Sequence, residues 1–146
     1  MLKGRIQADM REALKAGDKE RLKVLRMLLA AIKQIEIDER GELDDARVLA
    51  VIEKMVKQRR DSAHQFREGG RSDLADAERA EIAVLDTYLP EPLPEAELDA
   101  LIDTAIAESG AESVRDMGKV MGRLKPRVQG RADMAAVGAK VKARLA

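Results

Sequence analysis

Pro90-Glu91-Pro92-Leu93-Pro94 interrupts a chain that otherwise has the pattern of helix almost from end to end. Proline has no backbone N–H and restricts the residue before it, so no regular helix continues through this segment. The sequence therefore predicts two parts joined by a stiff linker. These are an N-terminal helical body over residues 1–90, the proline linker at residues 91–94, and a C-terminal three-helix basic subdomain over residues 95–146.

Four helices are predicted before the linker. Apolar residues recur at every fourth position from Leu2 to Leu14, and Gly17-Asp18 can end this first helix and cap the next one. The second helix extends to about residue 39 and is apolar around most of its circumference, which is expected at the centre of a bundle. Asp44 can cap a third helix through about residue 67.

Gly69-Gly70 predicts a turn, after which Ser72 can cap a fourth helix that runs to Leu89. Three shorter helices are predicted after the linker, at about residues 95–108, 114–124 and 134–145, with Gly110 and Pro126 ending the first two and Asp133 capping the last. No run of alternating apolar and polar residues predicts a strand. We therefore predict an all-α, multihelical fold with a four-helix N-terminal part and a small three-helix C-terminal part.

The 27 basic and 27 acidic side chains cancel in number but are unevenly distributed. Arg79 is the only basic side chain among residues 72–112, which hold twelve acidic ones. Residues 117–146 reverse this pattern, with eight basic side chains and Asp133 as the only acidic one. The polarity indicates an acidic body with a basic end, although chance clustering on solvated helix faces would give the same distribution.

Several classes of protein are disfavoured by what the sequence lacks. No apolar run approaches the roughly 18 residues of a membrane span, and no signal-peptide pattern follows Met1, so we expect a cytoplasmic protein without a membrane partner. The chain has no Cys, which excludes disulfides and thiolate chemistry.

No residue pattern predicts a catalytic site. The phosphate-binding loop, the dinucleotide fingerprint and the helical His-Glu-x-x-His motif are all missing. His64 follows Asp61 and Ser62, but neighbours this close do not face one another on a helix, so a triad is disfavoured. Asp99 and Asp103 are spaced to hold Mg²⁺, yet such a pair is more often a solvated helix face. We expect no catalytic residues, no metal, no cofactor and no turnover by the isolated chain.

Two glycines stand inside the helical pattern of residues 116–127, where each costs about 1 kcal/mol relative to alanine. At 100° per residue, Gly118 and Gly122 fall together on one flank of an apolar stripe, while Lys119 and Arg123 point away from it. Such bare backbone suits the close packing of another helix or the close approach of a nucleic-acid backbone. The sequence leaves both explanations open.

Cations around these glycines suit contact with phosphates. The candidate nucleic-acid-binding residues are Lys119, Arg123, Lys125, Arg127, Arg131, Lys140, Lys142 and Arg144, and the candidate close-approach glycines are Gly118, Gly122 and Gly130. Because Pro126 should end the preceding helix and Gly130 should loosen the loop after it, we expect Arg127 and Arg131 on a mobile rim.

The kind of partner follows from the scarcity of aromatic residues. Single-stranded nucleic acids are recognised largely by stacking on aromatic side chains, but Phe66 and Tyr88 are the only ones and fall in the N-terminal body. A basic surface without them should recognise shape and backbone, so tRNA or another folded RNA is the predicted partner. The alternative is a protein–protein adaptor that presents its acidic helices or its glycine flank to a protein partner.

Residues spread along most of the chain resemble those of stand-alone GatB/YqeY-motif proteins. The matching residues are Arg21-Leu22-x-x-Leu25-Arg26, Arg59-Arg60-Asp61-Ser62, Phe66, Gly70-Arg71-x-Asp73-Leu74, Glu78, Glu81-Ile82, Leu85, Tyr88-Leu89-Pro90, Asp116-Met117-Gly118-Lys119-Val120-Met121-Gly122, Pro126 and Gly130. The combination of Tyr-Leu-Pro with Met-Gly-Lys-Val-Met-Gly, in this order, is specific, whereas each alone would be weak.

The resemblance implies a two-part helical fold that is shared with the C-terminal tail of the B subunit of aspartyl/glutamyl-tRNA amidotransferase. In that enzyme the tail helps to engage tRNA, and other domains transfer the amide. The resemblance thus implies a tRNA-associated accessory module. A carbon–nitrogen ligase activity with glutamine as amide donor would belong to the large relative, whose kinase and glutamine-hydrolysis machinery has no counterpart here.

Overall fold

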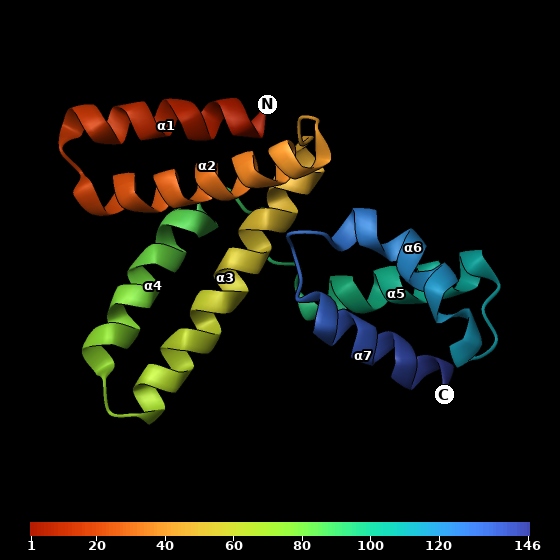
Figure 1. Ribbon diagram of the computed structural model, residues 1–146. Coiled ribbons are helices and arrows are strands. Elements are labelled where there is room, and N and C mark those ends of the chain that lie inside the picture. Colours follow the sequence, from red (N-terminus) through yellow and green to blue (C-terminus); the bar gives the residue numbers. More distant parts are fainter. The chain divides into compact units, whose positions relative to one another are not determined.

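The computed structural model describes every residue from Met1 to Ala146 and confirms the predicted all-α fold. It contains seven α-helices, one short 3-10 helix and no strand. The helices form two compact units, Met1–Leu89 with four of them and Pro90–Ala146 with three, and each unit has an apolar core of its own (Figure 1). None of the helices is both long and apolar enough to cross a membrane.

The first unit consists of two antiparallel helical hairpins, built from α1 (Leu2–Ala16), α2 (Lys19–Glu39), α3 (Asp45–Glu68) and α4 (Ser72–Asp86) (Figure 1). Local signals set the boundaries of α1, α2 and α3 as predicted. Asp18 accepts a hydrogen bond from the Arg21 backbone N–H, and Asp44 accepts one from that of Arg47. Gly17 ends α1 at a φ of 70°, which glycine adopts without strain.

The core of the first unit is aliphatic and draws on all four helices. Its large, fully buried side chains include Ile6, Leu25, Leu28, Ile32, Ile52 and Leu85. Tyr88 follows α4 and is also buried, with its hydroxyl donating to Asp9 at 2.6 Å and the Arg5 guanidinium 5.0 Å from its ring centre. Burial raises the pKa of Tyr88, so its hydroxyl remains a hydrogen-bond donor.

Two nearly buried charged groups in this unit are paired. Arg59 Nε donates to Glu81 at 3.1 Å, which joins α3 to α4. Glu36 accepts from Lys3 Nζ at 2.8 Å and from the Leu43 backbone N–H at 3.0 Å, and the bond from Lys3 lowers the pKa of this carboxyl. A buried charge without such a partner would be strongly destabilising.

The second unit is a three-helix arrangement of α5 (Glu95–Ser109), α6 (Met117–Val128) and α7 (Met134–Leu145), with the 3-10 helix η1 (Val114–Asp116) before α6. Its fully buried side chains are Ile102, Ala105, Val120, Leu124, Val128, Val137 and Val141. Asp133 caps α7 as predicted, accepting from the Ala135 N–H at 3.1 Å. The Leu93 N–H donates to the Arg131 carbonyl at 2.8 Å, which attaches the proline-rich segment to this unit.

Helix α6 does not end before Pro126, as the sequence predicted, but continues to Val128. Pro126 lies in the last turn, where it removes one hydrogen bond, the one to the Gly122 carbonyl. Val128 follows Val120 and Leu124 at helical spacing and is fully buried. Its burial stabilises the unit by about 1.5–3 kcal/mol, which is comparable to the roughly 3 kcal/mol that an interior proline costs.

The boundaries of α4 also differ from the prediction. Ser72 is its first residue and makes no capping hydrogen bond, and the helix ends at Asp86 rather than Leu89. The Thr87 hydroxyl donates to a carbonyl of the last turn at 2.7 Å. Because Pro90 disfavours the helical conformation at Leu89, the chain leaves the helix early.

We predict that Pro126→Ala raises the free energy of unfolding of the second unit by about 1–2 kcal/mol. Alanine restores the missing N–H and removes the ring, and a more flexible unfolded chain offsets part of the gain. Thermal unfolding followed by far-UV circular dichroism measures the change. The control is Pro92→Ala, because Pro92 is exposed and outside any helix. An unchanged or lower melting temperature for Pro126→Ala alone would contradict the prediction.

Candidate nucleic-acid interface

Helix α6 presents one apolar face and one charged face. Val120, Leu124 and Val128 are buried, while Lys119 and Arg123 are exposed. At 100° per residue the exposed face has two edges. One edge carries Lys119, Arg123 and Arg127, each one turn from the next, and the other carries Gly118, Gly122 and Lys125.

The glycine edge of α6 is open. A Cβ atom built on Gly118 or Gly122 would meet no atom within 4 Å. No part of the second unit packs against them, so helix packing within that unit does not account for these glycines. Gly130 has a different role, because its φ of 78° lies in the left-handed region that favours glycine.

The cations of α6 form only long, exposed ion pairs. Lys119 lies 3.8 Å from Asp116, and Arg123 and Arg127 lie 3.6 and 3.5 Å from the same Glu108 carboxylate. The Lys119, Arg123 and Arg127 side chains are 71%, 51% and 44% exposed. Exposed pairs of this kind contribute about 0–1 kcal/mol, so a phosphate can replace Glu108 or Asp116 at little cost. Lys125 is exposed and forms no ion pair.

Arg131 is not on a mobile rim. Its Nε donates to the Glu91 carbonyl at 3.0 Å, and its backbone carbonyl accepts from Leu93. Both contacts fix Arg131 to the proline-rich segment. Arg127 lies within α6 rather than in the loop after it.

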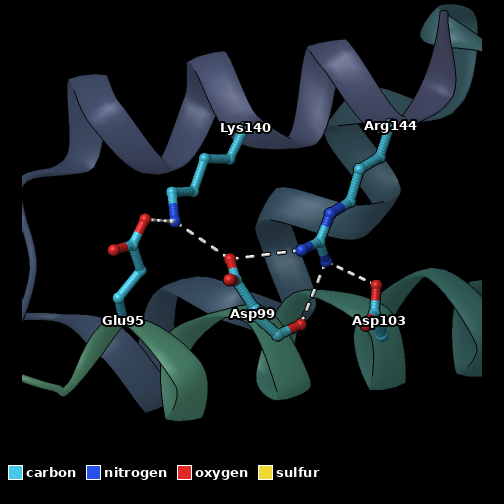
Figure 2. Close-up of polar contacts among 5 residues, drawn as sticks. All are labelled: Glu95, Asp99, Asp103, Lys140 and Arg144. Atoms are coloured by element: carbon cyan, nitrogen blue, oxygen red, sulfur yellow. Dashed lines mark hydrogen bonds and ion pairs between the residues drawn. The ribbon is translucent and has the colours of Figure 1, made fainter.

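Two cations of α7 are engaged with α5 (Figure 2). Lys140 Nζ lies 2.9 Å from Asp99 and 3.1 Å from Glu95. Arg144 forms an ion pair with the Asp99 carboxylate at 3.1 Å, and it donates hydrogen bonds to the Asp99 carbonyl at 3.0 Å and to Asp103. The Lys140 and Arg144 side chains are only 29% and 30% exposed.

The titration of Asp99 reflects this network. The hydrogen bond from Lys140 is the main cause that lowers the pKa of the Asp99 carboxyl below its ordinary value of 3.8, and the charge of Arg144 adds to it. The same hydrogen bond, together with Glu95, raises the pKa of the Lys140 ammonium above 10.5. Both groups are therefore held in their charged forms near neutral pH.

The eight predicted cations thus fall into different environments. Lys119, Arg123, Lys125 and Arg127 share the exposed face of α6, and Lys142 is exposed on α7. Lys140, Arg144 and Arg131 are held by contacts within the unit. Asp99, Asp103 and Glu95 were not predicted as the partners of Lys140 and Arg144. The matching spacing of Asp99–Asp103 and Lys140–Arg144, each four residues apart, was a usable signal.

Comparison with known proteins gives one family match and several curated relatives. The family model described as Yqey-like protein matches residues 3–145. The chain is 36% identical over 85 residues to Altered inheritance of mitochondria protein 41, mitochondrial, of Lachancea thermotolerans, covering 58% of this chain and 46% of that protein. It is 35% identical over 90 residues to the protein of the same name of Candida glabrata, covering 60% of this chain and 50% of that protein.

A further match is to Uncharacterized protein C22F3.15 of Schizosaccharomyces pombe, with 30% identity over 86 residues, 59% of this chain and 70% of that protein. The chain spans about half the length of the first two relatives. The match over residues 3–145 confirms the resemblance seen in the motif residues.

We predict that Asp99→Asn lowers stability near neutral pH and has no effect in strong acid. A carboxyl whose pKa is lowered by folding stabilises the protein above its unfolded pKa of about 3.8, and this contribution is lost as the pH falls through the lower folded pKa. Urea unfolding of both proteins at about pH 7 and about pH 2.5 measures the difference. Glu112→Gln, which removes an exposed carboxylate without an ion pair, should show no such pH-dependent difference.

Proposed function

The chain belongs to the Yqey-like protein family, and from this premise we propose that it is an accessory module that binds tRNA or another folded RNA through the exposed face of α6. The observation that carries the proposal is the row of Lys119, Arg123 and Arg127 beside the open backbone at Gly118 and Gly122. Amide transfer is not proposed for this chain.

The spacing of the row suits a phosphate backbone. Side chains four residues apart on a helix are separated by just over one turn, or roughly 6 Å along the axis, and long lysine and arginine side chains adjust to phosphates at similar intervals. Because glycine has no side chain, a nucleic-acid backbone can approach α6 closely at Gly118 and Gly122. Both features favour recognition of shape and charge over recognition of individual bases.

The choice of tRNA rests on the resemblance to the tail of the amidotransferase B subunit. That tail engages tRNA, and the Met117–Gly122 stretch of α6 belongs to the shared motif. The names of the relatives from Lachancea thermotolerans and Candida glabrata connect those proteins with mitochondria and their inheritance. For this chain a cytoplasmic location stays a prediction.

The adaptor alternative has less support. Much of the acidic surface that an adaptor would present is paired within the chain, since Asp99 and Asp103 contact α7, Glu81 contacts Arg59, and Glu108 contacts α6. A protein partner on the glycine edge would remain the explanation if RNA binding fails.

We predict saturable binding of tRNA in a fluorescence anisotropy titration with the full chain. For about four phosphate contacts, the logarithm of the association constant should fall against the logarithm of the salt concentration with a slope of about −3 to −4. Lys119→Ala/Arg123→Ala should weaken binding roughly tenfold or more at low salt and make the slope less steep by about 2.

A matched control exists on α1, where Arg11 and Lys15 have the same four-residue spacing, are exposed and form no ion pair. Arg11→Ala/Lys15→Ala removes the same charge and should leave the affinity and the salt slope nearly unchanged. Equal losses in both double variants would mean that net charge, rather than the face of α6, governs the affinity. Absence of saturable binding at low salt would rule out the proposal.

We also predict that Gly122→Leu lowers the affinity for RNA without lowering the stability of the protein. The side chain enters open space and replaces a residue that costs a helix about 1 kcal/mol, so the melting temperature should stay the same or rise. RNA affinity should fall, because the side chain covers the exposed backbone. Circular dichroism and the same titration measure the two effects. A lower melting temperature would contradict the open glycine edge, and an unchanged affinity would exclude Gly122 from the interface.

A further inference from the structure

A second basic feature lies in the first unit, in a cleft that is lined by residues of α3 and α4. The cleft has a volume of about 310 Å³ and is lined by Arg60, Ala63, His64 and Arg67 from α3 and by Arg79 and Ile82 from α4. Four of the six lining residues carry nitrogen donors. This volume is at the lower end of the range for small-molecule sites.

Helical spacing brings these residues together. Arg60, Ala63, His64 and Arg67 follow the i, i+3, i+4, i+7 pattern of one helix face, and Arg79 and Ile82 are three residues apart on α4. His64 is the only histidine of the chain, and Arg79 is the only cation among residues 72–112. The cleft therefore gathers several basic groups from two helices of the first unit.

The charges of the cleft are poorly neutralised. No carboxylate lines it, and Arg60 and Arg67 form no ion pair. Arg79 has only a 3.6 Å contact with Asp76, and His64 has a 3.8 Å contact with Glu68 between two largely exposed side chains. Like charges held around one cleft repel each other, and a bound anion would relieve this repulsion.

We propose that this cleft binds a small phosphorylated molecule through its phosphate groups. Guanidinium groups form paired hydrogen bonds to phosphate oxygens, and arginine residues of both helices line the cleft. Ala63 is buried and Ile82 half-buried, and they supply an apolar patch for the rest of the ligand. A long RNA backbone fits this arrangement less well than the single row on α6, so the site is independent of the proposed RNA interface.

Pyrophosphate is the probe that tests the cleft. Isothermal titration calorimetry of the full chain should show saturable binding of pyrophosphate, and Arg60→Gln/Arg67→Gln should weaken it at least tenfold. Backbone amide NMR shifts on addition of pyrophosphate should concentrate at residues 60–67 and 79–82. Both arginines are exposed, so the melting temperature of the double variant should be unchanged.

The matched control is Arg26→Gln/Lys33→Gln on α2, where two exposed cations have the same seven-residue spacing and no ion pair. This variant should bind pyrophosphate as the unmodified chain does. Equal weakening in both variants, or no saturable binding at millimolar pyrophosphate, would overturn the proposal. Loss of tRNA affinity in the cleft variant without any pyrophosphate binding would also overturn it, because the cleft would then be a contact for RNA.

Discussion

The pairing of Asp99 with Lys140 and Arg144 sets the charge pattern of the second unit. Helices α5 and α7 bury apolar faces against the same core, and their charged edges meet where Asp99 accepts from both cations (Figure 2). These partners also lower the pKa of the Asp99 carboxyl below its ordinary value. Because this contact occupies the middle and end of α7, the positive charge that remains available lies mainly on α6.

Residues 117–146 thus contain two kinds of cation, which differ in the length of their ion pairs and in the exposure of their side chains. The Lys140 and Arg144 contacts are short, shared among several acceptors and half-buried, whereas the pairs of Arg123 and Arg127 with Glu108 are longer and more exposed. Exposed single pairs contribute little to stability, so their cations can change partners. A count of basic residues in the sequence overstates the surface that a ligand can use.

The fold was predictable because its boundaries depend on local chemistry. Asp18, Asp44 and Asp133 cap the helices that they precede in sequence, and the chain divides into its two units at Pro90, where the proline-rich segment begins. The course of α6 past Pro126 was not predictable, because it depends on the burial of Val128 in the assembled core. The partners of Lys140 and the cleft beside Arg79 also depend on which helix faces pack against each other. This packing cannot be predicted from a single sequence.

Gly118 and Gly122 lower the helix stability of α6, and no contact within the second unit explains why glycine stands at these positions. Each lowers helix stability by about 1 kcal/mol relative to alanine, and a short unit has little stability in reserve. The left-handed turn at Gly130 requires glycine, but Gly118 and Gly122 are helical and adjoin empty space. Helix packing within the second unit does not account for them. Under the function proposed above, close approach of a ligand beside the weakly paired Lys119 and Arg123 would account for both observations.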